Sequence, residues 1–293
     1  MERKGLLKAT FAVIVWGASF IATKVALRDV SPVTVVWLRF GMGVGILGLA
    51  VIARREAFSV SAHNLRSFAL LGFLGITFHQ WLQSTGLITA RASTTAWIVS
   101  TIPIFIALLG RILLHEKLNR GRILGILIAT AGVLLVVSNG NLDALTRGTF
   151  GTIGDVLILI SAVNWAVFSV LSRRGLQQTP ASLMMFFVMG FGWLFTSLLF
   201  AAGPGFREIS HLTQQGWIAI IFLGVFCSGL AYIYWYDALK IVPASQVGSL
   251  LYLEPLVTAV VAAALISEPI VPMGILGGGI ILLGVWFVTR KHG

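Results

Sequence analysis

The chain has 293 residues, of which 57% are hydrophobic and only 11% are charged, and its formal net charge is +11. A soluble domain carries about 25% charged residues, so this composition argues against a soluble protein and predicts a polytopic, all-α membrane protein. The cations are scattered between apolar segments and form no basic face, which argues against a nucleic-acid partner. The single cysteine leaves no disulfide framework and no cysteine-based metal site.

Ten predominantly apolar segments follow one another along the chain. A helix needs about 20 such residues to cross a bilayer, and none of the segments alternates in polarity as a barrel strand does. The first segment is expected to be an uncleaved membrane helix and not a signal peptide, because no small-residue cleavage site follows it. We expect membrane helices at about 6–27, 33–53, 66–85, 92–113, 122–138, 152–172, 182–202, 215–236, 244–266 and 272–289.

The distribution of lysine and arginine predicts the orientation of these helices. Most of the 21 basic residues fall on the inner side of the membrane when the N-terminus is placed there. Because positive charge is retained on the cytoplasmic side, we expect both termini to be cytoplasmic and the protein to lie in the inner cell membrane.

The second half of the chain repeats the first. Residues 86–136 align without gaps on residues 238–288, which places Gly125 on Gly277 and Gly132 on Gly284. Each copy has five expected helices, and because five is odd, the second copy must enter the membrane the opposite way up. We therefore expect ten transmembrane helices in a five-plus-five inverted repeat.

The charges of the two copies fit an inverted arrangement. The connection before the fifth helix carries Lys117, Arg120 and Arg122, whereas its counterpart at 268–272 carries no cation. Inverted repeats are typical of alternating-access transporters, in which the substrate site lies near the membrane midplane between the halves. The two expected units are residues 1–144 and residues 145–293.

Several motifs carry a resemblance to a known family. They are "TIPIFIALLGRILLHEKLNRGRILGILIATAGVLLVV" at 101–137, "WGASFIATKVAL" and "WLRF" in the first two helices, and "YLEPLVTAVVAAALISEPI" in the ninth. In order and spacing they resemble the drug/metabolite transporter superfamily, EamA type. The resemblance implies ten helices in a five-plus-five inverted repeat and a central cavity lined by helices one, three, four, six, eight and nine. It also implies the export of amino acids or other small metabolites.

Glu254 is the first candidate for a functional residue, because it lies near the middle of the expected ninth helix. A charge at that depth costs at least about 2.5–3.5 kcal/mol, so an intramembrane carboxylate is a functional candidate by default. Pro255 follows it and Pro103 occupies the equivalent position in the first half, and both predict broken helices. Glu254 could bind a substrate ammonium group or take up a proton, or it could be a protonated or arginine-paired structural group.

The other candidate site residues are polar or aromatic and lie within expected helices. The full set of expected substrate-binding residues is Trp16, Ser19, His79, Gln83, Trp97, Ser100, Asn164, Trp165, Tyr232, Tyr252 and Glu254. Ser93, Trp97 and Ser100 are spaced by four and three residues and therefore share one helix face, and the second copy has a matching stripe at 245–252. Such a stripe is either a cavity wall or a set of interhelical hydrogen bonds, and its recurrence in both halves favours the cavity.

Four further charged residues lie at other depths in the expected helices. Arg39 could extend to the outer surface, pair with a carboxylate or hold a substrate carboxylate, and a structural role is favoured. Lys24 lies closer to the interface and is expected to extend into it. Glu116 and Glu268 lie at helix ends, where we expect them to cap helices or pair with cations.

The glycines predict close helix packing, and a homodimer through them is left open. The small-xxx-small pairs are Gly41/Gly45, Gly121/Gly125 and Gly274/Gly278.

The sequence as a whole predicts a secondary transporter. It has no nucleotide-binding motif, so transport would run on a gradient, with no cofactor and no metal. We expect a small-molecule substrate, in particular amino acids with large or aromatic side chains, and membrane lipid as the surroundings. A flippase or exporter for lipid-linked compounds or drugs on the same scaffold is the alternative. An integral membrane enzyme is a minor one, because the five histidines are far apart and show no metal-ligand spacing.

Overall fold

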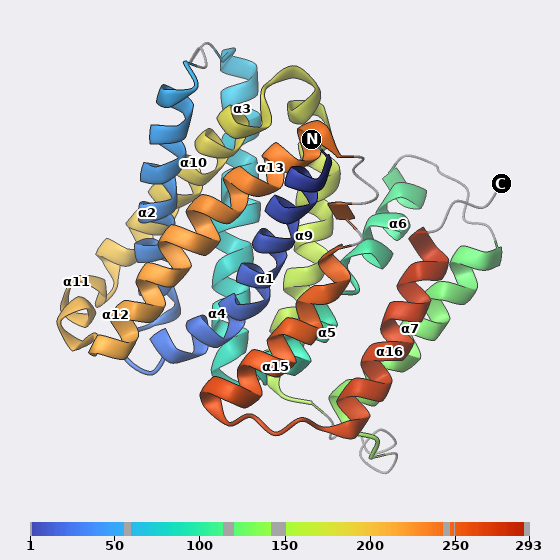
Figure 1. Cartoon of the computed structure of the whole chain (residues 1–293). Helices are drawn as coiled ribbons and strands as arrows, with labels where there is room; N and C mark the ends of the chain where they lie inside the picture. Colours follow the sequence, from blue (N-terminus) through green and yellow to red (C-terminus); the bar gives the residue numbers. More distant parts are fainter. Residues whose placement is uncertain are drawn as a thin grey trace.

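A computed structural model describes residues 2–55, 60–113, 120–141, 151–242, 247–248 and 250–289. These residues form helices joined by short connections, and no strand occurs among them (Figure 1). The helices of the first half are α1 (Glu2–Ala26), α2 (Pro32–Ala53), α3 (Ala62–Gly72), η1 (Phe73–Phe78), α4 (His79–Thr89), α5 (Ala92–Val99), α6 (Ile102–Leu113) and α7 (Arg120–Ser138). Those of the second half are α9 (Ile153–Gln178), α10 (Ala181–Ala202), α11 (Gly205–Glu208), η2 (Ile209–His211), α12 (Gln214–Ile221), η3 (Phe222–Leu230), α13 (Ala231–Ile241), η4 (Leu250–Leu253), α15 (Glu254–Ile266) and α16 (Pro272–Thr289).

The helices make ten passes in the expected order, and successive passes run in alternating directions (Figure 1). Six of the described helices are long and apolar enough to cross a membrane, and three shorter apolar helices lie at 123–138, 250–266 and 272–288. The remaining pass, residues 62–89, is continuous and carries the polar residues His79, Gln80 and Gln83 in its second half.

The fourth pass is broken, as Pro103 predicts. Helix α5 ends at Val99 and α6 begins at Ile102, because a proline lacks the amide hydrogen for the preceding turn and its ring clashes with that turn's carbonyl. Pro255 has a similar effect in the second half, where the 3-10 turn η4 precedes α15. Thr152 and Asp155 form a capping box at the start of α9.

Helices α7 and α16 show directly that the repeat is inverted. A Cβ atom at Gly125 would lie 2.6 Å from the carbonyl oxygen of Gly284, and one at Gly132 would lie 2.7 Å from that of Gly277. The two helices are therefore antiparallel and in backbone contact, as Figure 1 also shows. Since Gly277 and Gly284 are the repeat counterparts of Gly125 and Gly132, each helix meets its own counterpart upside down.

The other helix contacts between the halves show the same symmetry. Helix α1 packs against α12, η3 and α13, while its counterpart α9 packs against α3, η1 and α4. Helices α2 and α10, which are also counterparts, pack against each other. A pseudo-twofold axis thus relates the two five-helix units. The expected boundary between residues 144 and 145 lies outside the described residues.

Two π-helices interrupt the third and eighth passes at equivalent places. Both η1 and η3 begin with the sequence Phe-Leu-Gly, at 73–75 and 222–224. Each is flanked by α-helix on both sides, so the pass widens locally and then resumes. A π-helix is rare and often lies at a functional site, and this pair marks the middle of two passes that line the interface between the halves.

Candidate functional site

Four of the expected site residues lie around one buried centre between the halves. The Trp16 ring packs edge-on against Tyr232 at 5.5 Å, and the His79 ring lies 4.7 Å from Trp165. Trp16 and Trp165 pack against the same hydrophobic cluster, which contains Tyr232. Residues of both halves therefore meet here in pairs, Trp16 with Tyr232 and His79 with Trp165.

The histidine is held in place by the second half. His79 is 4% exposed, and its Nδ1 atom lies 3.1 Å from the carbonyl oxygen of Ser161 on α9. The Nδ1 atom therefore carries the hydrogen, because a carbonyl oxygen can only accept. The imidazole ring packs against the Trp165 ring. Gln83 is partly buried and lies one turn further along α4.

Arg39 joins this centre from α2, where the sequence left its role open. Its Nε atom donates to Ser228 Oγ at 3.1 Å, and its Nη1 atom donates to Gln80 Oε1 at 3.4 Å. The residue is 5% exposed, and the guanidinium lies 5.0 Å from the Phe40 ring. In the described part of the chain no carboxylate is within ion-pair distance of Arg39. Extension to the outer surface and pairing with a described carboxylate are therefore both excluded in this conformation.

Neither Ser228 nor a role for Gln80 was predicted from the sequence. Gln80 directly follows His79, so the two lie on adjacent faces of α4. Ser228 precedes Tyr232 by four residues, which is one helical turn, and this spacing in an otherwise apolar segment was the signal that could have identified it.

Asn164 and Trp16 bind backbone carbonyl groups of the two π-helices. The Asn164 side-chain amide donates to the carbonyl of Leu74 in η1 at 2.7 Å, and Trp16 Nε1 donates to the carbonyl of Cys227 in η3 at 3.1 Å. Ser19 Oγ donates back to the carbonyl of Trp16 at 2.6 Å. These expected site residues thus have a structural task, which is to fasten the first helix of each half to a π-helix of the other half.

Glu254 lies beside α1, next to the centre. It is the first residue of α15, and a Cβ atom at Gly17 would lie 2.9 Å from its carbonyl oxygen. Thr258 Oγ1 donates to the carbonyls of both Gly17 and Glu254, at 2.8 and 2.9 Å. The Glu254 side chain is partly buried, and its carboxylate has no hydrogen-bond or ion-pair partner among the described residues.

Trp97 and Tyr252 lie elsewhere, in a cluster formed with α7 and α16. The Trp97 indole fills the space that the missing side chain of Gly278 leaves, with ring atoms 2.5 Å from where a Cβ atom would be. Tyr252 packs against the same cluster, and Ser100 Oγ donates to the carbonyl of Trp97 at 2.7 Å. These three expected site residues are not brought together with Trp16 and His79. Ser245 and Ser249, from the matching stripe, lie outside the described residues.

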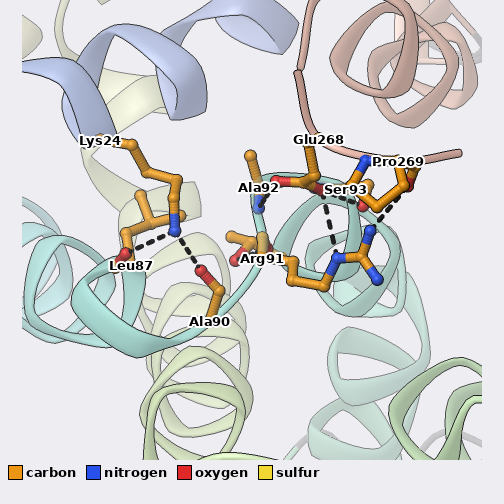
Figure 2. A network of polar contacts seen from close by, with 9 residues as sticks. Lys24, Leu87, Ala90, Arg91, Ala92, Ser93, Glu268 and Pro269 are labelled. Atoms are coloured by element: carbon orange, nitrogen blue, oxygen red, sulfur yellow. Dashed lines mark hydrogen bonds and ion pairs between the residues drawn. The ribbon is translucent and has the colours of Figure 1, made fainter. Parts of the chain in front are cut away.

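Polar contacts join the connection before α16 to the start of α5, as Figure 2 shows. The Glu268 carboxylate accepts from the backbone amides of Ala92 and Ser93, both at 3.0 Å, and from the Ser93 hydroxyl. Arg91 donates to the carbonyl of Pro269 at 2.6 Å, and its Nε atom lies 3.7 Å from Glu268. The expected capping role of Glu268 is confirmed, and the connection 267–271 is held on the start of α5. Glu116 lies outside the described residues.

Lys24 belongs to the same network, so the expectation that it extends to the interface is wrong. Its Nζ atom donates to the carbonyls of Leu87 and Ala90, at 3.0 and 2.6 Å (Figure 2). These carbonyls lie at the end of α4, where the last turn has no internal donors. Lys24 therefore satisfies the helix end and ties α1 to the start of α5.

A second group of caps joins the two halves at the starts of α2 and α12. Asp29 accepts from the amide and hydroxyl of Thr213 at the start of α12, at 2.9 and 2.6 Å. In return Glu208 accepts from Ser31 and from Thr34 Oγ1 at the start of α2, at 2.5–3.0 Å. Burial raises the pKa of Glu208, but these hydrogen bonds outweigh it, so that the pKa lies below its ordinary value.

At the opposite end of the bundle one carboxylate joins three helices. Asp237 on α13 pairs with Lys8 of α1 at 2.8 Å and with Arg54 at the end of α2 at 2.9 Å. Above it, a cavity lined by residues that include Arg54, Tyr232 and Tyr236 has a volume of about 10 Å³, which is the space of one water molecule at most. Polar contacts therefore join helices of the two halves at both ends of the bundle.

The comparisons with known proteins agree with this architecture. A model of the EamA-like transporter family matches the chain twice, over residues 3–138 and 152–290. The chain belongs to the EamA-like transporter family. It is a multi-pass membrane transporter of small molecules and not an enzyme.

Similar proteins extend over nearly the whole of this EamA-like transporter. A protein of Archaeoglobus fulgidus described as an uncharacterized transporter is 28% identical over 292 residues, which are 100% of this chain and 99% of that protein. A protein of Salmonella typhimurium described as a probable amino-acid metabolite efflux pump is 26% identical over 98% of this chain and 95% of its own length. A crystal structure that covers 97% of this chain and 98% of its own has a TM-score of 0.69 at 20% identity, which shows the same fold.

Proposed function

We propose that this protein is a secondary active transporter that exports amino acids with large or aromatic side chains across the inner membrane. The observation that carries the proposal is the buried aromatic and polar centre to which both halves contribute. Trp16 and His79 of the first half face Tyr232 and Trp165 of the second, at ring distances of 5.5 and 4.7 Å. Aromatic faces suit large side chains, while the polar groups among them suit the charged ends of an amino acid.

The inverted repeat supports alternating access as the mechanism. Two units related by a twofold axis in the membrane plane can exchange their conformations, which opens the site first to one side and then to the other. The Salmonella typhimurium relative, described as a probable amino-acid metabolite efflux pump, supports amino acids as the cargo and export as the direction.

Glu254 is proposed to couple the substrate or a proton to this exchange. It lies beside Gly17, one residue from Trp16, and its carboxylate is not committed to another described group. A carboxylate in this place can bind an ammonium group or change its protonation as the site opens. The proposed orientation puts both termini in the cytoplasm, and α1 begins at the end of the bundle where α16 finishes (Figure 1).

Transport by purified protein in vesicles tests the proposal. We expect exchange of radiolabelled phenylalanine, tryptophan or leucine in counterflow, and a Glu254→Gln variant with a lower rate and a flattened pH profile. Glu2→Gln removes an exposed carboxylate from α1 and is the matched control, with expected wild-type behaviour. Counterflow of none of the amino acids would refute the cargo, and a Glu254→Gln variant with unchanged rate and pH profile would remove Glu254 from the mechanism.

A further inference from the structure

We infer that Arg39 binds the carboxylate group of the transported substrate. The inference rests on the proposed transport function and gives it a substrate class: compounds with a carboxylate next to a bulky apolar group. It follows from the burial of Arg39, from the kind of partners it has, and from its place beside the aromatic centre.

The guanidinium group is directed into the protein and not toward the outer surface. Arg39 lies in the first half of α2, where a long side chain could have extended to the membrane surface. Instead it is 5% exposed and its donors reach Gln80 on α4 and Ser228 on η3. A charge is kept inside a membrane protein at a considerable free-energy cost, which needs compensation by a counter-charge or by function.

The described partners of Arg39 do not provide a counter-charge. They are a hydroxyl at 3.1 Å and an amide oxygen at 3.4 Å, and both are neutral. A guanidinium group has five N–H donors, of which these contacts use two, and the longer contact is a weak one.

No carboxylate in the described part of the chain pairs with Arg39, and this includes Glu254 beside α1. Asp237 pairs with two cations at one end of the bundle and Glu268 pairs with Arg91 at the other. Asp29 and Glu208 cap the starts of α12 and α2, and Asp155 caps α9. An anion from outside the chain is therefore the missing partner, and the planar fork of a guanidinium matches a carboxylate with two parallel hydrogen bonds.

The position of Arg39 suits a substrate that also contacts the aromatic centre. Gln80 is the neighbour of His79, and Ser228 lies one turn before Tyr232. Helices α2 and η3 are in backbone contact here, because a Cβ atom at Gly43 would lie 3.0 Å from the carbonyl oxygen of Ser228. A carboxylate that displaces the Gln80 oxygen would place the attached side chain toward the Trp16–Tyr232 and His79–Trp165 pairs.

The alternative is that Arg39 only ties three helices together. The two roles differ in what the protein recognises, so the test compares three probes of one shape. Phenylalanine carries an ammonium and a carboxylate, 3-phenylpropionate carries only the carboxylate, and phenethylamine carries only the ammonium. Their binding to purified protein is measured by thermal shift and by inhibition of counterflow, in sodium chloride of constant ionic strength.

We expect the wild type to bind phenylalanine and 3-phenylpropionate, and phenethylamine much more weakly. In Arg39→Gln the affinity for both carboxylates should fall about ten- to a hundredfold while that for phenethylamine is unchanged, because one charge-assisted interaction is lost. The affinity of Arg39→Lys for the carboxylates should lie between those of the wild type and Arg39→Gln, since an ammonium group cannot form two parallel hydrogen bonds to a carboxylate. Arg207→Gln, which removes an exposed cation, is the control with wild-type affinities.

Several outcomes would overturn the inference. Three of them concern the wild type: equal affinity for phenethylamine and 3-phenylpropionate, no binding of either carboxylate, or equal stabilisation by chloride and by the carboxylates. The fourth is an Arg39→Gln variant that still prefers carboxylates to phenethylamine. The first three need no variant, so a folding defect of Arg39→Gln leaves the inference open to refutation. If 3-phenylpropionate binds in a way that depends on Arg39 but no amino acid shows counterflow, the carboxylate site is supported. In that case only the proposed amino-acid export is refuted.

Discussion

An alanine at Gly132 or Gly277 should force α7 and α16 apart. A Cβ atom at Gly132 would lie 2.7 Å from the carbonyl oxygen of Gly277, and one at Gly277 would lie 2.9 Å from that of Gly132. Ordinary contacts of a Cβ atom begin at 3.4 Å. Because the opposing atoms belong to the backbone, no rotamer change relieves the clash, and the helices must separate by about 0.5–0.7 Å.

The expected loss of stability follows from that separation. A gap of about 0.5–1 Å forfeits a quarter to a half of the dispersion energy of each contact across it, and overpacking a tight interface costs about 1–3 kcal/mol. We expect each single variant to lose stability in this range. The double variant Gly132→Ala/Gly277→Ala should lose less than the two single losses added together, because the first methyl group already opens the space that the second one needs.

Unfolding of the purified protein in detergent, followed by heat or denaturant, measures these losses. Gly279→Ala is the matched control, since this glycine is exposed on the same helix and a Cβ atom there would meet nothing within 4 Å. Equal losses in Gly279→Ala and Gly132→Ala, or strictly additive losses in the double variant, would refute the close antiparallel crossing.

Three further changes test contacts at the helix ends and at a π-helix. Glu268→Gln removes the charge that holds the start of α5. A cysteine placed at position 94 should then react faster with a membrane-impermeant thiol reagent. An unchanged rate of this reaction would contradict the role of Glu268. Glu208 has a lowered pKa in the folded state, so its contribution to stability is present at neutral pH and is lost as the pH falls through that folded value. Glu208→Gln should therefore flatten the acidic part of a plot of Tm against pH, and an unaltered slope would exclude this cap as the cause. Asn164→Leu leaves the carbonyl of Leu74 without its donor and should lower the free energy of unfolding by about 1–3 kcal/mol, whereas a wild-type denaturation curve would show that water replaces the amide.

The order and breaks of the helices could be predicted from the sequence because they depend on local signals. Apolar runs long enough to span a bilayer fixed the ten passes, and Pro103 fixed the break of the fourth. The inverted repeat was visible in the paired glycines, whose counterparts Gly125 and Gly277 both pack within the chain at the α7–α16 crossing.

The composition of the site could be predicted only in part, because a helix face does not specify which neighbour it meets. The stripe of Trp97 and Ser100 was expected to line a cavity, but the Trp97 indole fills the space beside Gly278 on α16. Lys24 was expected at the interface, but unpaired carbonyls at the end of α4 attract it. Neither neighbour can be found from the spacing of residues within one helix.

The π-helices were also absent from the prediction, although they orient both acceptors of Arg39. Ser228 lies within η3, and Gln80 is the second residue after the end of η1. In each π-helix a backbone carbonyl is bound by a side chain of the other half, Asn164 in one case and Trp16 in the other. Nothing in the sequence Phe-Leu-Gly predicts a wider turn, and the side chains that bind these carbonyls come from distant positions in the chain.

The same pair of π-helices would link the proposed substrate site to the movement that alternating access requires. Each π-helix is fastened to the first helix of the opposite half, so a displacement of one half against the other strains the bond to Leu74 or to Cys227. Relief of that strain by a return to α-helical turns would rotate the residues that follow, among them Gln80, and withdraw its oxygen from Arg39. Binding of a carboxylate in place of the Gln80 oxygen would then be coupled to the exchange of conformations, because the helix that moves also carries the side chain that contacts the guanidinium when no substrate is bound.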